Sequence, residues 1–178
     1  MKKQIMLMLV MLVVPCFAHA DEISLDITYP KSGSMIEHGS GEVAIWVEDA
    51  REGKVFGKSV DGVALVASSD VASSLYAYMV SSLKQAGYTV VPYSAELVGG
   101  LLIQIRTVRY HSVKEMVKSN VKVGVALEAK ANNSNATRTY KAAVEDEFAW
   151  KPSDEKSGEM IGRALATAAD AALSDLNK

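Results

Sequence analysis

The chain has 178 residues, of which 49% are hydrophobic, and its formal net charge is −2 at pH 7. This length and apolar content predict a chain that can bury a sizeable core, and they exclude a mostly disordered protein. The near balance of 19 basic and 21 acidic side chains excludes a strongly basic nucleic-acid binder. We therefore expect no nucleic-acid partner.

The first 20 residues have the pattern of a secretory signal peptide. Lys2 and Lys3 provide a positive start, residues 5–14 are an unbroken apolar run, and Ala18-His19-Ala20 is a small-x-small cleavage site. The apolar run is too short to span a bilayer, and a buried N-terminal helix is the weaker alternative. Cleavage after Ala20 leaves residues 21–178, which we expect to form a single domain with a net charge of −4 and no Cys.

Cys16 offers a competing processing site. A Cys that follows an apolar stretch is typical of a lipoprotein signal, in which that Cys carries the lipid anchor. The position before such a Cys normally holds Gly, Ala or Ser, whereas this chain has Pro15. We therefore expect cleavage after Ala20 and a periplasmic protein, with a chain anchored to the outer membrane through Cys16 as the alternative.

Apolar periodicity predicts the element order β-β-α-β-β-β-β-α. Alternation of apolar residues indicates strands over 23–29, 43–48, 88–93, 101–110, 121–131 and 137–150, with loops at 31–41 and after residue 48 and a polar, mixed segment over 111–120. Asp70 is expected to cap a helix that ends at Gly87, and Ser153 or Asp154 to cap a helix with an apolar stripe to Leu176. The simplest fold is α+β, with one antiparallel-rich mixed sheet and two helices on one face. The first helix can serve as a right-handed crossover between parallel neighbours.

Two motifs that suggest a ligand site are better explained by structure alone. The run 53–59, which ends in Lys58-Ser59, lacks the spacing of a phosphate-binding loop, and Val60-Asp61-Gly62 is a poor helix start, so we expect no nucleotide. His38 and His111 are isolated histidines of the mature chain, and we expect them to be solvated rather than metal ligands. A Ser-His-Asp triad is not excluded by counting residues, but the chain has no G-x-S-x-G elbow.

Charged residues on two strands also allow a functional and a structural interpretation. Glu145 and Glu147 fall on one face of the last strand, where paired carboxylates can do acid–base chemistry if burial raises one pKa. We favour a solvated edge strand whose charges block aggregation. Asp49 and Arg51 follow the second strand, and we expect them to pair in a turn.

Aromatic residues form the third candidate site. Two lie on the first predicted helix, two flank the third strand, and two lie on strands: Tyr76, Tyr78, Tyr88, Tyr93, Trp46 and Trp150. They can line an apolar groove between the helices and the sheet. Core packing explains them equally well, because strand aromatics usually pack inside.

Short motifs in a fixed order resemble the YajG-like family of bacterial envelope lipoproteins. They are Val47-Glu48-Asp49-Ala50-Arg51, then Gly57, then Leu83-Lys84-Gln85-Ala86-Gly87-Tyr88, then Leu101-Leu102-Ile103-Gln104-Ile105, then Thr137-Arg138-Thr139-Tyr140 before a C-terminal helix. The resemblance covers residues 42–176. It implies a lipid-anchored envelope protein and supplies no catalytic residues, whereas this chain has a weak lipidation site at Cys16.

Together these features predict a non-enzymatic exported protein with a binding or scaffolding role in a Gram-negative envelope. We expect no catalytic residues, no cofactor and no metal, and a protein or lipid partner that meets a sheet edge or a helix–sheet groove. The alternatives are a carrier of an apolar envelope ligand and a small hydrolase that uses Glu145 or Glu147.

Overall fold

A computed structural model describes residues 21–31, 36–94, 96, 100–134 and 136–175. The predicted signal peptide lies outside the described residues, as do its two processing positions, Cys16 and Ala20. Leu176, expected at the end of the last helix, also falls outside them. Among the described residues, no helix is long and apolar enough to cross a bilayer.

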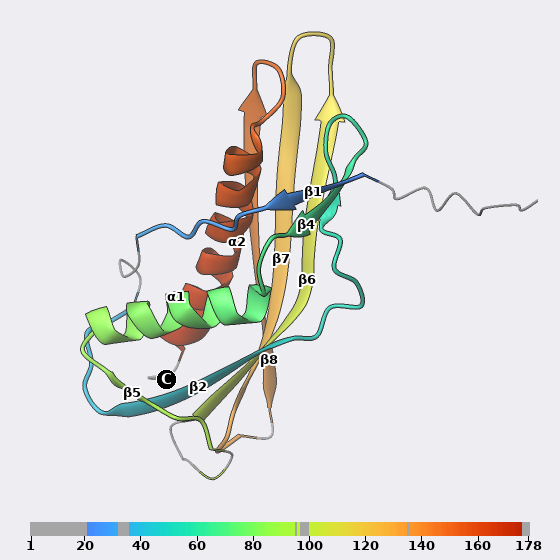
Figure 1. The fold of residues 1–178 in the computed structure, drawn as a ribbon. Coiled ribbons are helices and arrows are strands. Elements are labelled where there is room, and N and C mark those ends of the chain that lie inside the picture. Colours follow the sequence, from blue (N-terminus) through green and yellow to red (C-terminus); the bar gives the residue numbers. More distant parts are fainter. Residues whose placement is uncertain (1–20, 32–35, 95, 97–99, 135, 176–178) are drawn as a thin grey trace, which may run out of the picture.

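The described chain forms one mixed sheet and two helices, which confirms the α+β class (Figure 1). The elements are β1 (Glu22–Leu25), β2 (Glu42–Asp49), β3 (Gly57–Lys58), β4 (Ala64–Ala67), α1 (Val71–Gln85), β5 (Thr89–Val91), β6 (Gly100–Lys114), β7 (Ser119–Ala131), β8 (Thr137–Phe148) and α2 (Asp154–Ser174). The sheet follows the order β1-β4-β3-β6-β2-β5, and the antiparallel strands β7 and β8 continue it from β6. The strands β2 and β5 are parallel neighbours, as a crossover through α1 requires.

One face of the sheet carries the core and both helices. Figure 1 shows α1 lying across β2 and α2 running along β7 and β8 on the same side. Alternate residues of the strands point at these helices, and Ile45, Ile103 and Leu127 are almost fully buried there. A bulge between Ile105 and Thr107 shifts the alternation in β6, so that Val108 continues the buried face.

Both helices begin where the sequence predicts. The Asp70 carboxylate accepts the Ser73 N–H at 2.7 Å, and the Ser153 hydroxyl accepts the Lys156 N–H at 3.2 Å. Each contact satisfies a backbone donor that the first helical turn leaves open. Gly87 has a φ of +98° just after α1. This left-handed conformation commonly ends a helix, and Gly adopts it without the steric cost that a Cβ would bring.

Residues 26–31 form an extended strap from β1 across α2 toward α1. A Cβ added at Gly158 or Gly162 of α2 would overlap the carbonyl oxygens of Asp26 and Thr28, so the strap lies directly on the helix backbone. The sequence prediction of a strand over 23–29 is therefore wrong at its end, because the strap packs on a helix instead of pairing with a strand. Its alternation persists, with Ile27 and Tyr29 half-buried.

Two other boundaries also differ from the prediction. The segment expected as a loop after residue 48 holds β3 and β4, which are short strands that pair with each other and with β6 and β1. The polar segment 111–120 is largely strand, because β6 continues to Lys114 and β7 starts at Ser119. In both places, pairing with a neighbouring strand overrides weak local propensity.

Candidate functional site

The sheet has an open edge along the second half of β2. The strand β5 pairs with β2 only from Glu42 to Ala44, and it ends at Val91, directly before Pro92. Proline has no N–H to donate to a ladder, so the pairing stops there. On its other side β2 pairs with β6 as far as Asp49. In the described part of the chain, no strand covers residues 45–49 on the β5 side.

Backbone groups of β2 point at this open edge. The Ala50 N–H donates to the Ile105 carbonyl of β6 at 3.1 Å, and the Thr89 N–H of β5 donates to the Gly41 carbonyl at 2.9 Å. Successive peptide groups of a strand alternate between its two sides. The N–H and C=O of Val47 therefore point away from β6, toward the side that β5 leaves open.

A groove of about 720 Å³ runs along this edge, and we call it the β2-edge groove. Helix α1 supplies one wall through Ala72, Ser73 and Tyr76. Trp46 and Tyr93 stand on the other side, with ring centroids 6.5 Å apart. The indole of Trp46 is 54% exposed, which is unusual for so large an apolar side chain.

Hydrogen bonds on both sides hold the groove in shape. The Tyr93 hydroxyl donates to the Asn132 side-chain oxygen at 2.8 Å, which ties this wall to the end of β7. Asp70 is the charged residue that lines the groove, and hydrogen bonds from the Ser73 side chain and backbone hold its pKa below the usual range. Apart from this carboxylate, which caps α1, the groove offers a mainly apolar surface and a backbone edge.

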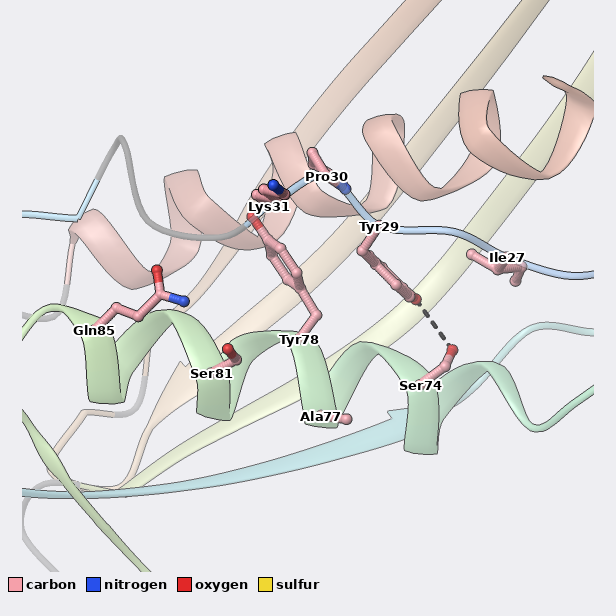
Figure 2. Close-up of a pocket in the computed structure, with 9 residues that line it drawn as sticks. All are labelled: Ile27, Tyr29, Pro30, Lys31, Ser74, Ala77, Tyr78, Ser81 and Gln85. Atoms are coloured by element: carbon pink, nitrogen blue, oxygen red, sulfur yellow. Dashed lines mark hydrogen bonds between the residues drawn. The ribbon is translucent and has the colours of Figure 1, made fainter. Parts of the chain in front are cut away.

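A second hollow lies between the strap and α1, and Figure 2 shows its lining. The rings of Tyr29 and Tyr78 stack there at 5.1 Å. The Tyr29 hydroxyl bonds to the Ser74 hydroxyl at 3.1 Å, and the Tyr78 hydroxyl donates to both oxygens of Asp170 at 2.9 and 3.0 Å. Both phenols are thus engaged inside the protein, so the hollow is a packing feature of the strap.

Burial shifts the ionisation of this tyrosine cluster. It raises the pKa of Tyr29 to about 12, and it raises the pKa of Tyr78 well beyond the usual range, helped by the nearby Asp170 carboxylate. Desolvation also raises the pKa of Asp170, which the hydrogen bond from Tyr78 partly opposes. The phenols therefore stay neutral, and the cluster serves to join α1 to α2.

Asp49 and Arg51 form the turn pair that the sequence predicts. The Arg51 guanidinium donates to both Asp49 oxygens at 2.7 Å and lies 4.9 Å from the centre of the Phe56 ring. The Arg51 hydrogen bond is the main cause that lowers the pKa of Asp49. The side chain of Arg51 is only 7% exposed, so the pair anchors the chain after β2.

The other residues considered for catalysis or metal binding do not gather at one place. His38 lies by the C-terminal end of α1, whereas His111 lies within β6 rather than after it, and both are exposed. Glu145 and Glu147 are 66% and 59% exposed and pair with Lys122 and Lys118 across the strand.

Their setting agrees with the solvated edge strand favoured from the sequence, since β7 is the only described strand that pairs with β8. Gly57 and Lys58 form β3, so no helix follows the Lys as a phosphate loop requires. The described residues contain no cluster of three or more His, Cys, Asp or Glu suited to a metal ion.

The six aromatic residues separate into three groups. Trp46, Tyr76 and Tyr93 meet in the β2-edge groove, as the groove interpretation predicts. Tyr78 and Tyr88 belong to the core. Trp150 lies away from the groove, after β8, where it is 67% exposed beside Lys114. Sequence reasoning missed that Val47 offers a backbone edge, and the signal for it was Pro92, which shortens the neighbouring strand.

Comparison with known proteins shows the family of the chain. A family model described as "Uncharacterized lipoprotein" matches residues 30–177, in agreement with the resemblance to the YajG-like lipoproteins. A comparison with curated proteins found no match.

Two solved structures are similar to parts of the chain. Lipoprotein GNA1162 from Neisseria meningitidis is 11% identical, with a TM-score of 0.33 over 61% of this chain and 84% of that one. A structure described as an uncharacterized protein is 14% identical, with a TM-score of 0.41 over 83% of this chain and 99% of that one.

Proposed function

The chain belongs to a family of lipoproteins, and on that premise we propose that it is an envelope protein whose function is binding rather than catalysis. Its ligand is an extended, apolar segment of another envelope protein. The segment adds to the sheet along the β2-edge groove, in line with β5. The observation that carries this proposal is the uncovered edge of β2 at Val47, set between aromatic walls.

Strand addition uses both features of the groove. An extended peptide gains main-chain hydrogen bonds from a free sheet edge, and pockets for alternate side chains provide specificity. Side chains of a strand point alternately to the two faces of the sheet. One set of peptide side chains would meet Ala72 and Tyr76 of α1, and the other set would meet Trp46 and Tyr93. Because the lining is almost uncharged, apolar side chains are favoured on both sides.

The arrangement of charged groups supports binding over catalysis. The carboxylates considered for acid–base chemistry, Glu145 and Glu147, are exposed and ion-paired on β8. His111 of β6 lies in the same cross-strand row as Glu145, but Lys122 of β7 stands between them and pairs with Glu145. A general acid or base needs a partner within hydrogen-bond reach of a common substrate position. The groove brings together aromatic rings and a backbone edge, which is the chemistry of a recognition site.

The test uses a random dodecapeptide library displayed on phage and panned against the exported protein. We expect the selected peptides to alternate apolar side chains and to lose binding to a Trp46→Ala, Tyr76→Ala double variant. Losing two aromatic anchors should weaken binding by at least about tenfold. Trp150→Ala removes the other exposed indole, which lies outside the groove, and is the matched control. Peptides that bind the double variant as well as the unmodified protein would contradict the proposal.

Processing decides where this binding takes place. The proposal places the mature domain at the periplasmic side of the envelope, either free from Asp21 or held at the outer membrane through Cys16. The intact mass of the protein from its native host separates the two, since a lipidated chain begins at Cys16 and carries acyl chains. A chain that retains residues 1–15 would contradict export.

A further inference from the structure

A second exposed apolar surface lies at the other end of β6 from the β2-edge groove, at the turn between β6 and β7. Met116 and Val117 are 96% and 76% exposed there, and Val113 of β6 is 45% exposed. Trp150, 67% exposed, joins them from the loop after β8, because the Ser119 hydroxyl donates to its backbone carbonyl. We call these four residues the apolar tip; Figure 1 shows both loops at the same end of the sheet.

A hydrogen bond and ion pairs hold the turn that carries the tip. The Glu115 N–H donates to the Lys118 carbonyl at 2.8 Å, which closes the turn that carries Met116 and Val117. The Lys118 ammonium pairs with Glu147 at 2.8 Å and with Glu115 at 3.6 Å, so both carboxylates at the base of the turn are ion-paired and the three groups together carry a net charge of −1. The two apolar side chains therefore project into solvent with no unpaired carboxylate between them.

The composition of the tip matches the interfacial layer of a bilayer. Trp is enriched at membrane interfaces because its ring is apolar and its N–H is polar, and Lys keeps its ammonium in water while its stem lies on apolar surface. The Lys114 ammonium lies 5.4 Å from the centre of the Trp150 ring, whereas Lys151, which follows Trp150 directly, pairs with Asp61 at 2.7 Å. Aliphatic Met and Val between such groups are suited to enter the acyl boundary.

The start of β1 lies toward the same end of the sheet as the tip, so a lipid anchor on the preceding segment would bring the membrane to this end. In the ladder, Glu22 at the start of β1 is level with Ala64, which pairs with Lys58. Because Gly57 pairs with Tyr110 in β6, Glu22 is level with His111, five residues before Met116 along the chain. At the rise of a strand this is about 17 Å below the tip.

The N-terminal segment is long enough to cover this height. Five peptide steps separate Cys16 from Asp21, and they span at most about 17 Å when extended. A lipid on Cys16 can therefore sit in the same plane as the tip. We propose that the apolar tip inserts into the lipid interface of the envelope membrane, so that the domain contacts the membrane with one defined end and presents the β2-edge groove away from it.

The two tryptophans of the chain make this testable, because one lies in each surface. Trp46→Phe leaves Trp150 as the reporter of the tip, and Trp150→Phe leaves Trp46 as the reporter of the groove. Each protein, processed from the full precursor, is mixed with excess vesicles of phosphatidylethanolamine and phosphatidylglycerol that contain brominated acyl chains. We expect the Trp150 emission to shift to shorter wavelength and to be quenched, and the Trp46 emission to stay unchanged.

Controls separate insertion from simple tethering. A Met116→Asp, Val117→Asp change in the Trp46→Phe background should abolish the shift and the quenching of Trp150. Val55→Asp changes an exposed apolar residue, 48% exposed, outside the tip and should leave both intact. Trp150 emission that vesicles do not alter, or equal quenching of both tryptophans, would overturn the inference. Neither result would bear on peptide binding in the groove.

Discussion

Gly162 of α2 has no free space for a side chain, although it lies inside a helix. A Cβ at this position would overlap the carbonyl oxygen of Thr28 and lie 2.6 Å from its carbonyl carbon. Ordinary carbon–carbon contact begins at about 3.5 Å, so the strap would have to move by roughly 1 Å. The perturbation is therefore Gly162→Ala, a change that usually stabilises a helix.

The magnitude follows from two opposing effects. Ala favours a helix interior over Gly by about 1 kcal/mol. Overpacking against a well-seated backbone costs about 1–3 kcal/mol. Displacing the strap also weakens the Tyr29–Ser74 hydrogen bond and the Tyr29–Tyr78 stack, each worth about 0.5–1.5 kcal/mol. We expect the free energy of unfolding to fall by about 1–5 kcal/mol, the upper end applying if both contacts are lost.

Urea unfolding followed by circular dichroism measures this change. Gly124→Ala in β7 is the matched control, because a Cβ there meets nothing within 4 Å and its stability should not fall. Hydrogen exchange should also rise in residues 26–31 of the Gly162→Ala protein. A Gly162→Ala protein as stable as the unmodified one would refute the claim that the strap rests on the helix backbone.

Three further changes test the charged and phenolic groups. Tyr78→Phe leaves the buried Asp170 carboxylate without its hydrogen bonds and should cost about 1.5–3 kcal/mol in urea unfolding. Because burial raises the pKa of Asp170, the folded protein holds that proton more tightly than the unfolded chain; stability from this group is greatest below about pH 4 and declines as pH rises through the raised pKa. Asp170→Asn removes this decline. The free energy of unfolding of the variant, relative to that of the unmodified protein, should therefore rise between pH 4 and 7, and a difference that stays constant with pH would contradict the assignment. Glu147→Gln breaks an exposed pair with Lys118 and should leave both the melting temperature and export unchanged; a folded variant that loses a measured turnover would revive the hydrolase alternative.

Features with a local cause were predictable from the sequence. Asp70 and Ser153 cap the helices because a short oxygen-bearing side chain can reach the first free N–H groups. The hairpin of β7 and β8 follows from strict alternation on both sides of an Asn-rich turn. These signals lie within a few residues of the structure that they specify.

Features with a distant cause were not predictable. The strands β3 and β4 have two and four residues, and they exist because β6 and β1 lie beside them. The strap leaves the sheet because Gly158 and Gly162, more than 120 residues away, open a path along α2. No pattern within residues 22–31 carries that information.

The candidate site shows the same division. The aromatic pattern predicted a groove, and Trp46, Tyr76 and Tyr93 do line one. The same pattern did not separate them from Tyr78, because Tyr76 and Tyr78 both lie on α1 and only packing against α2 decides which is buried. The edge at Val47 depends on where another strand stops, which the sequence marks only through Pro92.

Amide hydrogen exchange at Val47, measured by nuclear magnetic resonance with and without a peptide selected from the dodecapeptide library, tests the central claim most directly. Strand addition along β2 predicts that the Val47 amide becomes protected when the peptide binds, while the amide of Val144 in the distant strand β8 keeps its rate. Tight peptide binding with no change at Val47 would contradict the account, because the peptide would then occupy a surface other than the β2-edge groove.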